Sequence, residues 1–312
     1  MAAFVMIPLT KLVRRYLAHR RALGFILENE HRSLPKFARF HEHAAPGQSL
    51  QTSLVLKWAA QPGTGSRTYY AKRLMSVRGF AKYCAALDPR VQIPDYRLFG
   101  AWYVRKTPHL YSPEEIRHLM RRARDLPTFR SPLRPVTYET FVGLIACTGL
   151  RVREAMRLRL DDVDLDAGTL RVARCKFSPE RVLPIHPSTV SALRRYRAAR
   201  CRLHPFGEMF FVGRSGRPLR TTRVHYDFRE LRRGIVANGA RPAPRIHDLR
   251  HTFATRHITA WSRAAAPVSH RLLLLSRYLG HRDFGDTWWY ISADPTMLRT
   301  ASVRFQRFKN QR

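Results

Sequence analysis

Acidic residues are scarce in this sequence. Only 22 Asp and Glu stand against 57 Lys and Arg, the formal net charge is +35, and no acidic residue precedes Glu28. Such an imbalance carries no information about the fold, but cations spread along the whole length predict a polyanionic partner. Nucleic acid is the partner that we expect, and an anionic membrane surface and a ribosomal or packaging role are the alternatives.

Cysteine and long apolar runs are rare as well. The sequence has four widely separated cysteines, which form no CxxC or His/Cys cluster: Cys84, Cys147, Cys175 and Cys201. We therefore expect no zinc or other metal site, and a reduced, cytosolic-type compartment is the default. Because no apolar run approaches the ~18 residues that a transmembrane helix needs, we also expect no membrane partner.

The length of 312 residues predicts two domains, since single cores rarely grow past ~250 residues. Residues 1–95 are typical of a small helical domain, residues 96–109 show no clear period and are interpreted as a linker, and residues 110–312 form the second domain.

The apolar and then basic start, residues 1–21, could pass for a transit peptide. A helix is the simpler interpretation, because apolar residues recur there with a period of 3.6: Leu9, Leu12, Val13, Tyr16 and Leu17.

The last helix expected in the first domain, within residues 66–87, has two contrasting faces. Its buried stripe consists of Tyr70, Leu74, Val77, Phe80 and Tyr83. Its basic face carries Arg67, Lys72, Arg73 and Arg78. We predict that this face binds DNA, and a merely solvated face is the alternative.

The second domain alternates helical and strand patterns. Ser112 followed by Pro113 predicts a helix start. A buried helix is expected over 141–147 and should end at Thr148-Gly149. Arg151 opens the next helix, and Glu154 follows it by three positions, on the same face. Residues 163–165, 169–172 and 181–185 alternate like strands, and Lys176 lies in the turn before the third. The expected fold is therefore mainly α with a small antiparallel β-sheet, in two domains.

The last third of the chain carries residues suited to phosphate chemistry. His247, Arg250 and His281 can hold or move protons near a phosphate, and Tyr290 is a phenol that can attack one. A phenol is a poor nucleophile at its free pKa, near ~10. It becomes effective where cations neutralise the group that it attacks. Tyr278 is a rival phenol, but it lies on a leucine-rich helical stretch and is expected in the core.

These residues carry a resemblance to a known family. In order, the sequence has Arg151 in T-G-L-R-x-x-E, Lys176 in a β-turn, His247 and Arg250 in H-D-L-R-H, His281 in L-G-H, and Tyr290 nine residues later. This resembles the tyrosine recombinase (phage integrase) family over roughly residues 107–305. Residues 1–95 resemble the family's helical core-binding domain only in pattern.

The sequence departs from the family pattern in three places. The segment between His251 and His281 is longer than usual, and we expect its residues around 261–270 to form a surface loop. The turn at Lys176 lacks the usual glycines. Two tryptophans, Trp288 and Trp289, precede Tyr290 and are expected to pack around it.

The resemblance implies a function. Tyr290 would attack a DNA phosphate and form a 3′-phosphotyrosyl link, with Lys176 as the acid for the leaving 5′ oxygen and His247 as the proton acceptor. Arg151, Arg250 and His281 would hold the phosphate oxygens, and Glu154 would orient them. No metal, cofactor or ATP is implied.

The implied role is site-specific recombination of a mobile element in the bacterial cytoplasm. The implied partner is double-stranded DNA, bound by a homo-tetramer whose protomers are monomers or weak oligomers when free. A type IB topoisomerase and a catalytically inactive DNA-binding protein are the alternatives. The C-terminal tail, residues 296–312, has apolar residues at helical spacing, including Phe305 and Phe308. The tail packs either on its own protomer or on a neighbouring one.

Overall fold

The structure is a computed structural model of the whole chain, and the contacts between residues divide it into two compact units, 1–105 and 106–312. It describes residues 7–61, 63, 65–101, 107–129, 131–173, 180–235, 243–264 and 268–292. Lys176 and the tail, residues 296–312, lie outside the described residues. The division between the units falls within the range 96–109.

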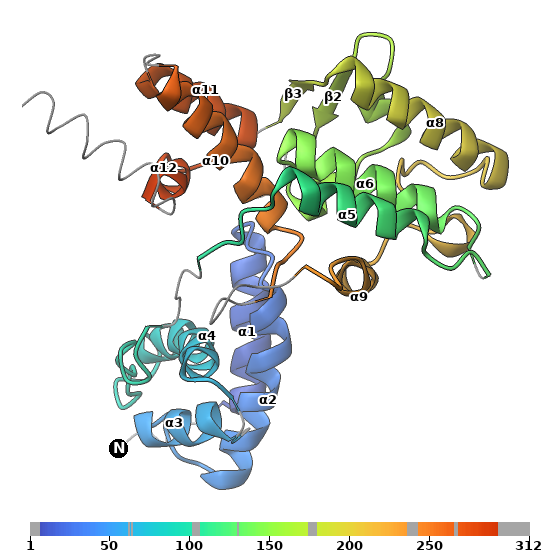
Figure 1. Ribbon diagram of the computed structural model, residues 1–312. Helices are drawn as coiled ribbons and strands as arrows, with labels where there is room; N and C mark the ends of the chain where they lie inside the picture. The colour runs from blue at the N-terminus through green and yellow to red at the C-terminus, as the bar shows by residue number, and fades with distance from the viewer. Residues whose placement is uncertain are drawn as a thin grey trace, which may run out of the picture. The chain divides into compact units, whose positions relative to one another are not determined.

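The first unit is built from helices. In Figure 1 these are α1 (Leu9–Ala22), α2 (Glu28–Ala44), α3 (Thr52–Ala60) and α4 (Arg67–Ala85). The apolar stripes predicted from the 3.6-residue period meet in one core, where Val13, Leu17, Leu74, Val77 and Phe80 are buried. The expectation of a helix near the N-terminus is thereby confirmed.

The second unit is mainly helical with one small sheet, as predicted. Its helices are α5 (Pro113–Arg124), α6 (Arg134–Thr148), α7 (Val152–Met156), α8 (Pro187–Leu203), α9 (Thr221–Leu231), α10 (Asp248–Arg263), α11 (Val268–Leu279) and α12 (Gly285–Ser292). Helix α6 packs against α5, α8 and α10. Most of its apolar residues are buried, Phe141, Val142, Leu144 and Ile145 among them, which is typical of a central helix.

The sheet has three antiparallel strands in the order β1-β2-β3. They are β1 (Val163–Asp164), β2 (Thr169–Val172) and β3 (Arg181–Pro184). Leu170 pairs with Leu183, and Val172 pairs with Arg181 at the root of the β2–β3 hairpin. The loop of that hairpin contains position 176, so its root fixes where the loop begins.

The end of the second unit has its own small core. Helices α10, α11 and α12 bury Ala254, Ile258, Leu272, Leu279 and Tyr290 together. The expected surface loop around 261–270 is wrong in extent, because α10 continues to Arg263 and α11 begins at Val268. The apolar face of α10 continues through Ile258 to Trp261, which packs against this core and keeps the chain helical.

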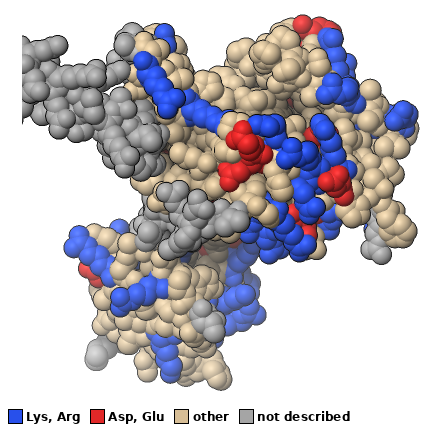
Figure 2. Space-filling model, in the orientation of Figure 1, with Lys and Arg blue, Asp and Glu red and all other residues tan. Residues whose placement is uncertain are grey.

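Basic side chains are more prominent than acidic ones on the face of the molecule drawn in Figure 2. Figure 2 shows Lys and Arg spread over the visible face of both units, with fewer acidic side chains between them. No helix among the described residues is both long and apolar enough to span a bilayer.

Candidate active site

Arg151 is held by a turn between two helices. Helix α6 ends at Gly149, whose φ of 64° is the left-handed conformation that stops a helix, and Arg151 precedes the first turn of α7. The Glu154 carboxylate accepts from the Arg151 backbone N–H at 2.9 Å and from its Nη1 at 2.8 Å. Arg151 Nη2 donates to the Gly280 carbonyl at 2.9 Å. The predicted Arg151–Glu154 pair therefore links α7 to the end of α11.

Arg250 lies on α10 and is only 1% exposed. Its Nη1 donates to the Gly149 carbonyl and its Nη2 to the Leu279 carbonyl, both at 2.8 Å. Burial lowers the pKa of Arg250, and the neighbouring Tyr290 acts in the opposite direction. Tyr290 is thus next to Arg250.

His281 follows α11 and contacts Arg250. Arg250 Nη2 lies 2.8 Å from His281 Nε2, and His281 Nδ1 lies 2.6 Å from the hydroxyl of the buried Thr287. Since a guanidinium only donates, Nε2 accepts and Nδ1 carries the proton of the neutral ring. Burial, followed by the charges of Arg250 and Arg151, lowers the pKa of His281 to about 3. The ring is therefore neutral at pH 7.

Tyr290 lies on α12 and is 3% exposed. It stacks on His281 with ring centroids 5.8 Å apart, and His251 meets it edge-on at 5.2 Å. Of the two tryptophans expected to pack around it, Trp289 packs against the same core, whereas Trp288 is exposed. Tyr278 lies on α11 and stacks on Phe253, in keeping with its expected place in the core.

His247 directly precedes α10, and the ring of His251 lies between it and Tyr290. Its ring centroid lies 5.0 Å from that of His251, which also contacts Tyr290. His247 is exposed to solvent. Partial removal of water from around the ring, followed by the charges of His251 and Arg250, lowers the pKa of His247 to about 3. A neutral ring is therefore available to accept a proton.

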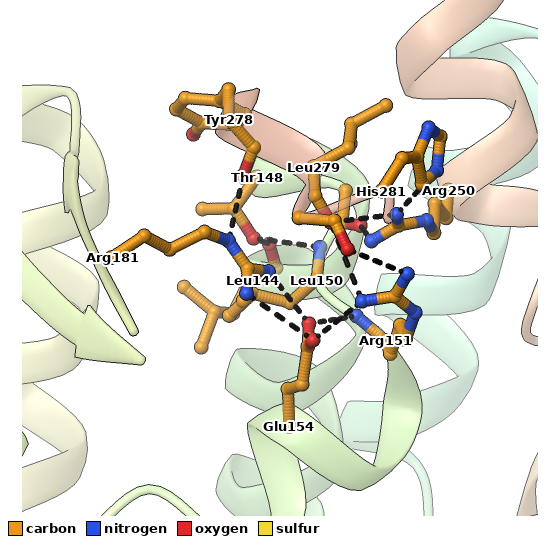
Figure 3. A network of polar contacts seen from close by, with 12 residues as sticks. Leu144, Thr148, Leu150, Arg151, Glu154, Arg181, Arg250, Tyr278, Leu279 and His281 are labelled. Carbon is orange, nitrogen blue, oxygen red and sulfur yellow. Dashed lines mark hydrogen bonds and ion pairs between the residues drawn. The ribbon is translucent and has the colours of Figure 1, made fainter. Parts of the chain in front are cut away.

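Glu154 is a buried carboxylate between two arginines. Arg181 of β3 donates to it from Nη2 at 2.8 Å, on the side opposite Arg151 (Figure 3). Burial raises the pKa of Glu154, but the hydrogen bond and charge of Arg181, followed by those of Arg151, outweigh burial and bring the pKa below its ordinary value. The carboxylate is therefore charged at pH 7.

Sequence reasoning missed three members of this site. His251 is the second histidine of H-D-L-R-H, four residues after His247, and that i,i+4 spacing could have marked it as a neighbour. Arg181 and Thr287 are found only from their contacts with Glu154 and His281. The described residues contain no group of three His, Cys, Asp or Glu that could hold a metal ion.

The predicted DNA-binding residues of the first unit lie on α4. Arg67 and Lys72 are exposed, whereas Arg73 and Arg78 are half-buried. Arg73 lies 3.7 Å over the Trp58 ring and donates to the Trp58 carbonyl, and Arg78 donates to the Pro94 carbonyl. The guanidinium groups of Arg73 and Arg78 therefore also make contacts within the unit.

Known proteins are similar to this chain in sequence and in fold. Residues 111–297 match the phage integrase family. A putative integrase/recombinase, y4rB, of Sinorhizobium fredii is 39% identical over 302 residues, which cover 95% of this chain and 96% of the relative. Tyrosine recombinase XerC of Azotobacter vinelandii is 33% identical over 156 residues, 50% of this chain and 48% of the relative.

Two solved structures share the fold at low identity. The Tn1549 transposon integrase in complex with circular intermediate DNA matches with a TM-score of 0.68 and 16% identity, over 97% of this chain and 100% of that chain. The XerH site-specific recombinase in a post-cleavage complex with its difH substrate matches with a TM-score of 0.64 and 18% identity, over 88% of this chain and 78% of that chain. The chain therefore belongs to the phage integrase family and is a tyrosine recombinase.

Proposed function

We propose that this protein cuts and rejoins double-stranded DNA at specific sites through a covalent bond between Tyr290 and a 3′ phosphate. The observation that carries the proposal is the convergence of Arg151, Arg250 and His281, from three separate segments, around the ends of α11 and α12 where Tyr290 lies. A buried phenol among cations is the arrangement that phosphoryl transfer to tyrosine needs.

The arginines neutralise the phosphate. A phosphodiester carries a charge that repels a nucleophile, and more charge gathers on its nonbridging oxygens as the pentacovalent state forms. The planar donor groups of Arg151 and Arg250 suit those oxygens. His281 adds a third donor if the proton of its neutral ring moves from Nδ1 to Nε2, which accepts from Arg250 in this structure.

The bond changes balance without an added reactant. The Tyr290 oxygen forms a bond to phosphorus, the bond from phosphorus to the 5′ oxygen breaks, and the phenol proton passes to His247, with His251 in between. Lys176 gives a proton to the leaving 5′ oxygen. Because the phosphotyrosyl bond retains the energy of the phosphodiester, the reverse attack by a 5′ hydroxyl rejoins DNA, and neither step calls for ATP or a metal.

The charge distribution supports DNA as the partner. A net charge of +35 neutralises many phosphates, and the released counterions drive binding. On the first unit we assign phosphate contacts to Arg67 and Lys72, which are exposed. DNA binding by Arg73 and Arg78, which belong to the same basic face, stays a prediction.

We further propose that four protomers act together on DNA and recombine the ends of a mobile element. Strand exchange between two duplexes breaks four strands, which requires four tyrosines. We assign residues 296–312 to contacts with a neighbouring protomer, as the resemblance to the family suggests, and packing on the tail's own protomer is the alternative that would equally cover Phe305 and Phe308. A type IB topoisomerase shares this chemistry, but it acts alone and without a specific site, and the similar proteins are named as integrases and recombinases.

The test is covalent capture. Nicked duplexes of random sequence lose a short 5′ fragment after cleavage, so the protein is trapped on the sites that it cuts. Wild-type protein should enrich one sequence in the trapped material. Tyr290→Phe, which keeps the ring and its packing, should bind the enriched duplex and trap none. Trapping without sequence enrichment would favour the topoisomerase, and no trapping by the wild type would overturn the proposal.

A further inference from the structure

The ring of His281 has a hydrogen-bond partner on each nitrogen. Its Nε2 lies 2.8 Å from Nη2 of Arg250 (Figure 3), and its Nδ1 lies 2.6 Å from the hydroxyl of Thr287. Because a guanidinium only donates, Nε2 accepts from Arg250, and the proton of the neutral ring is on Nδ1 and is donated to Thr287. In this structure the nitrogen that faces Arg250 therefore carries a lone pair and has no proton to give to a phosphate.

The proposed function calls for the other neutral form of this ring. Nη2 of Arg250 donates both to the Leu279 carbonyl and to His281 Nε2. A phosphate oxygen bound by Arg250 beside His281 is an acceptor, and it repels the lone pair on Nε2. The repulsion becomes an attraction when the proton is on Nε2, because the ring then donates to the oxygen as Arg250 does. Phosphate binding therefore favours the form of His281 that is protonated on Nε2.

Thr287 has the one kind of side chain that pairs with both forms. It lies on α12 and is 0% exposed. A hydroxyl has two lone pairs and one hydrogen that rotates, so it accepts from a protonated Nδ1 or donates to a bare one. A carbonyl or carboxylate in the same place only accepts and would hold the proton on Nδ1. With the hydroxyl, neither form leaves a buried nitrogen without a partner, which would be costly.

Helix α12 brings this hydroxyl and the candidate nucleophile to the same ring. Thr287 precedes Tyr290 by three positions, so both side chains lie on one face of the helix. Tyr290 stacks on His281 with an angle of 28° between the rings. The backbone N–H of Thr287 donates to the Phe284 carbonyl at 2.9 Å, which holds Thr287 in the first turn of α12. The place of His281 is thus set from α12 by one hydrogen bond and one ring contact.

We propose that Thr287 is a positioning residue whose hydroxyl lets His281 change from a hydrogen-bond acceptor into a phosphate donor when DNA binds. In the free protein the hydroxyl accepts from Nδ1, and in the complex it donates to Nδ1. The inference rests on the proposed function. One proton leaves Nδ1 and one is added at Nε2, with water as the carrier, so the charge of the ring is unchanged. The ring of His281 is only half-buried, which gives water access to it.

Nitrogen NMR spectroscopy of the histidine rings tests the proposal directly, because a protonated ring nitrogen and one with a lone pair differ widely in chemical shift. Tyr290→Phe protein is compared free and bound to the enriched duplex, here called the captured site, whose phosphodiester it leaves intact. The His281 signals are those that His281→Asn lacks. We expect the proton on Nδ1 in the free protein and on Nε2 in the complex. A bound ring that is still protonated on Nδ1, or is protonated on both nitrogens, would overturn the proposal.

Substitutions of Thr287 test the same proposal through the rate of cleavage. Thr287→Val keeps the size of the side chain but leaves Nδ1 without a donor in the complex, so cleavage of the captured site at saturating protein should slow about 10²-fold, the usual worth of one donor to the transition state. Thr287→Ser keeps the hydroxyl and should cleave at close to the wild-type rate. Equal losses in the two variants would overturn the proposal, because they would assign the effect to packing of the methyl group. The NMR comparison requires no change at Thr287, so it decides the matter even if Thr287→Val does not fold.

A double substitution and a matched control show whether the effect passes through His281. Thr287→Val added to His281→Asn should cost little more than His281→Asn alone, because the partner of the hydroxyl is already gone. A full further loss in that background would contradict the proposal. Thr137→Val is the control, since Thr137 is 1% exposed and its hydroxyl donates to the Leu133 carbonyl at the start of α6. It should cleave at the wild-type rate, and a loss as large as that of Thr287→Val would count against a role particular to Thr287.

The outcome is separable from the fate of the proposed function. If the wild type forms no covalent complex with DNA, the proposed function fails. If the wild type forms it and Tyr290→Phe does not, the proposed function stands, and the His281 signals and the Thr287 variants then decide the inference alone.

Discussion

Arg250 illustrates how single residues keep the candidate site in shape before DNA arrives. Its guanidinium is 1% exposed and donates to the Gly149 and Leu279 carbonyls, which belong to two different helix ends. These contacts set its orientation, so the phosphate meets donors that need little reorganisation. Such preorganised charge is usually the largest contribution to catalysis of this kind.

We predict that Lys176 supplies the proton to the leaving 5′ oxygen. Lys176→Ala should slow cleavage by ~10²–10⁴-fold, the usual worth of a general acid. A substrate with a 5′-bridging sulfur should restore the rate, because its leaving group needs no proton. Single-turnover cleavage on the two substrates measures this. Equal impairment on both would move the acid role to another residue, with His247 the next candidate.

The neutral ring of His281 predicts a loss of stability in acid. In the unfolded chain, His281 binds a proton as the pH falls below the ordinary pKa of 6.5, whereas in the folded protein it does so only near 3. The unfolded state takes up more protons in this window, so stability falls as the pH drops from 6.5 toward 3. Thermal unfolding midpoints between pH 7 and pH 4 measure it.

A matched pair of variants assigns that pH dependence. His281→Asn should flatten the curve, since its side chain takes up no proton. His225→Asn should leave the curve unchanged, because His225 is exposed on α9. Identical curves for the wild type and His281→Asn would contradict the assignment.

The sequence pointed to most of the candidate site residues, but not to their partners. Through the family resemblance, T-G-L-R-x-x-E and L-G-H indicated Arg151, Glu154 and His281, and the structure brings these three to the end of α11. Arg181 looked like an ordinary strand residue, since its role depends on Glu154 and α11 coming together in the folded chain. The order His247, His251, Tyr290 likewise depends on how α12 packs against α10.

At the scale of elements, local signals set the helix ends that hold the site. Ser112 caps α5 in a reciprocal pair with Glu115, as its position before Pro113 predicted. The length of α10 could not be predicted from the same kind of signal. Its last turn is helical because Trp261 packs against a core that forms only when α11 and α12 are in place.

A second prediction concerns Gly149, which ends helix α6. A Cβ at this position would lie 2.6 Å from Phe253 Cδ1 and 2.9 Å from Leu279 Cδ2, and φ is +64°. Gly149→Ala should cost about 1–2 kcal/mol for the left-handed backbone and about 1–3 kcal/mol more for overpacking. It should also reduce covalent capture, because the Gly149 carbonyl orients Arg250.

Gly168 is the control for that substitution. It has the same φ of +64°, but a Cβ there would meet its neighbours only at 3.7 Å. Gly168→Ala should therefore show the backbone cost alone and keep full capture activity. Chemical denaturation and the capture assay measure both effects, and equal behaviour of the two variants would contradict the account of Gly149.

For the molecule as a whole, charge composition and family membership both indicate a nucleic-acid partner. The charge composition alone predicts a polyanionic partner, and the fold and relatives are those of tyrosine recombinases. Charge alone could not separate DNA from other polyanions, because electrostatic attraction does not depend on their chemistry.

The C-terminal tail carries the whole-molecule prediction. Deleting residues 296–312 should leave the monomer folded but weaken cooperative assembly on DNA, because the tail is assigned to a neighbouring protomer. Native gel shifts on the captured site report assembly, and thermal unfolding reports the fold. A deletion that lowers the unfolding midpoint while assembly of the folded fraction stays unchanged would favour packing of the tail on its own protomer.

The central claim is that the Tyr290 oxygen becomes bonded to a DNA 3′ phosphate, and mapping the trapped complex tests it most directly. The wild-type complex would be digested with protease and nuclease, and the modified peptide sequenced by mass spectrometry. We expect one nucleotide joined through its 3′ phosphate to Tyr290, an unchanged product from Tyr278→Phe, and no product from Tyr290→Phe. A nucleotide joined to Tyr278 or any other side chain, or joined through its 5′ phosphate, would contradict it.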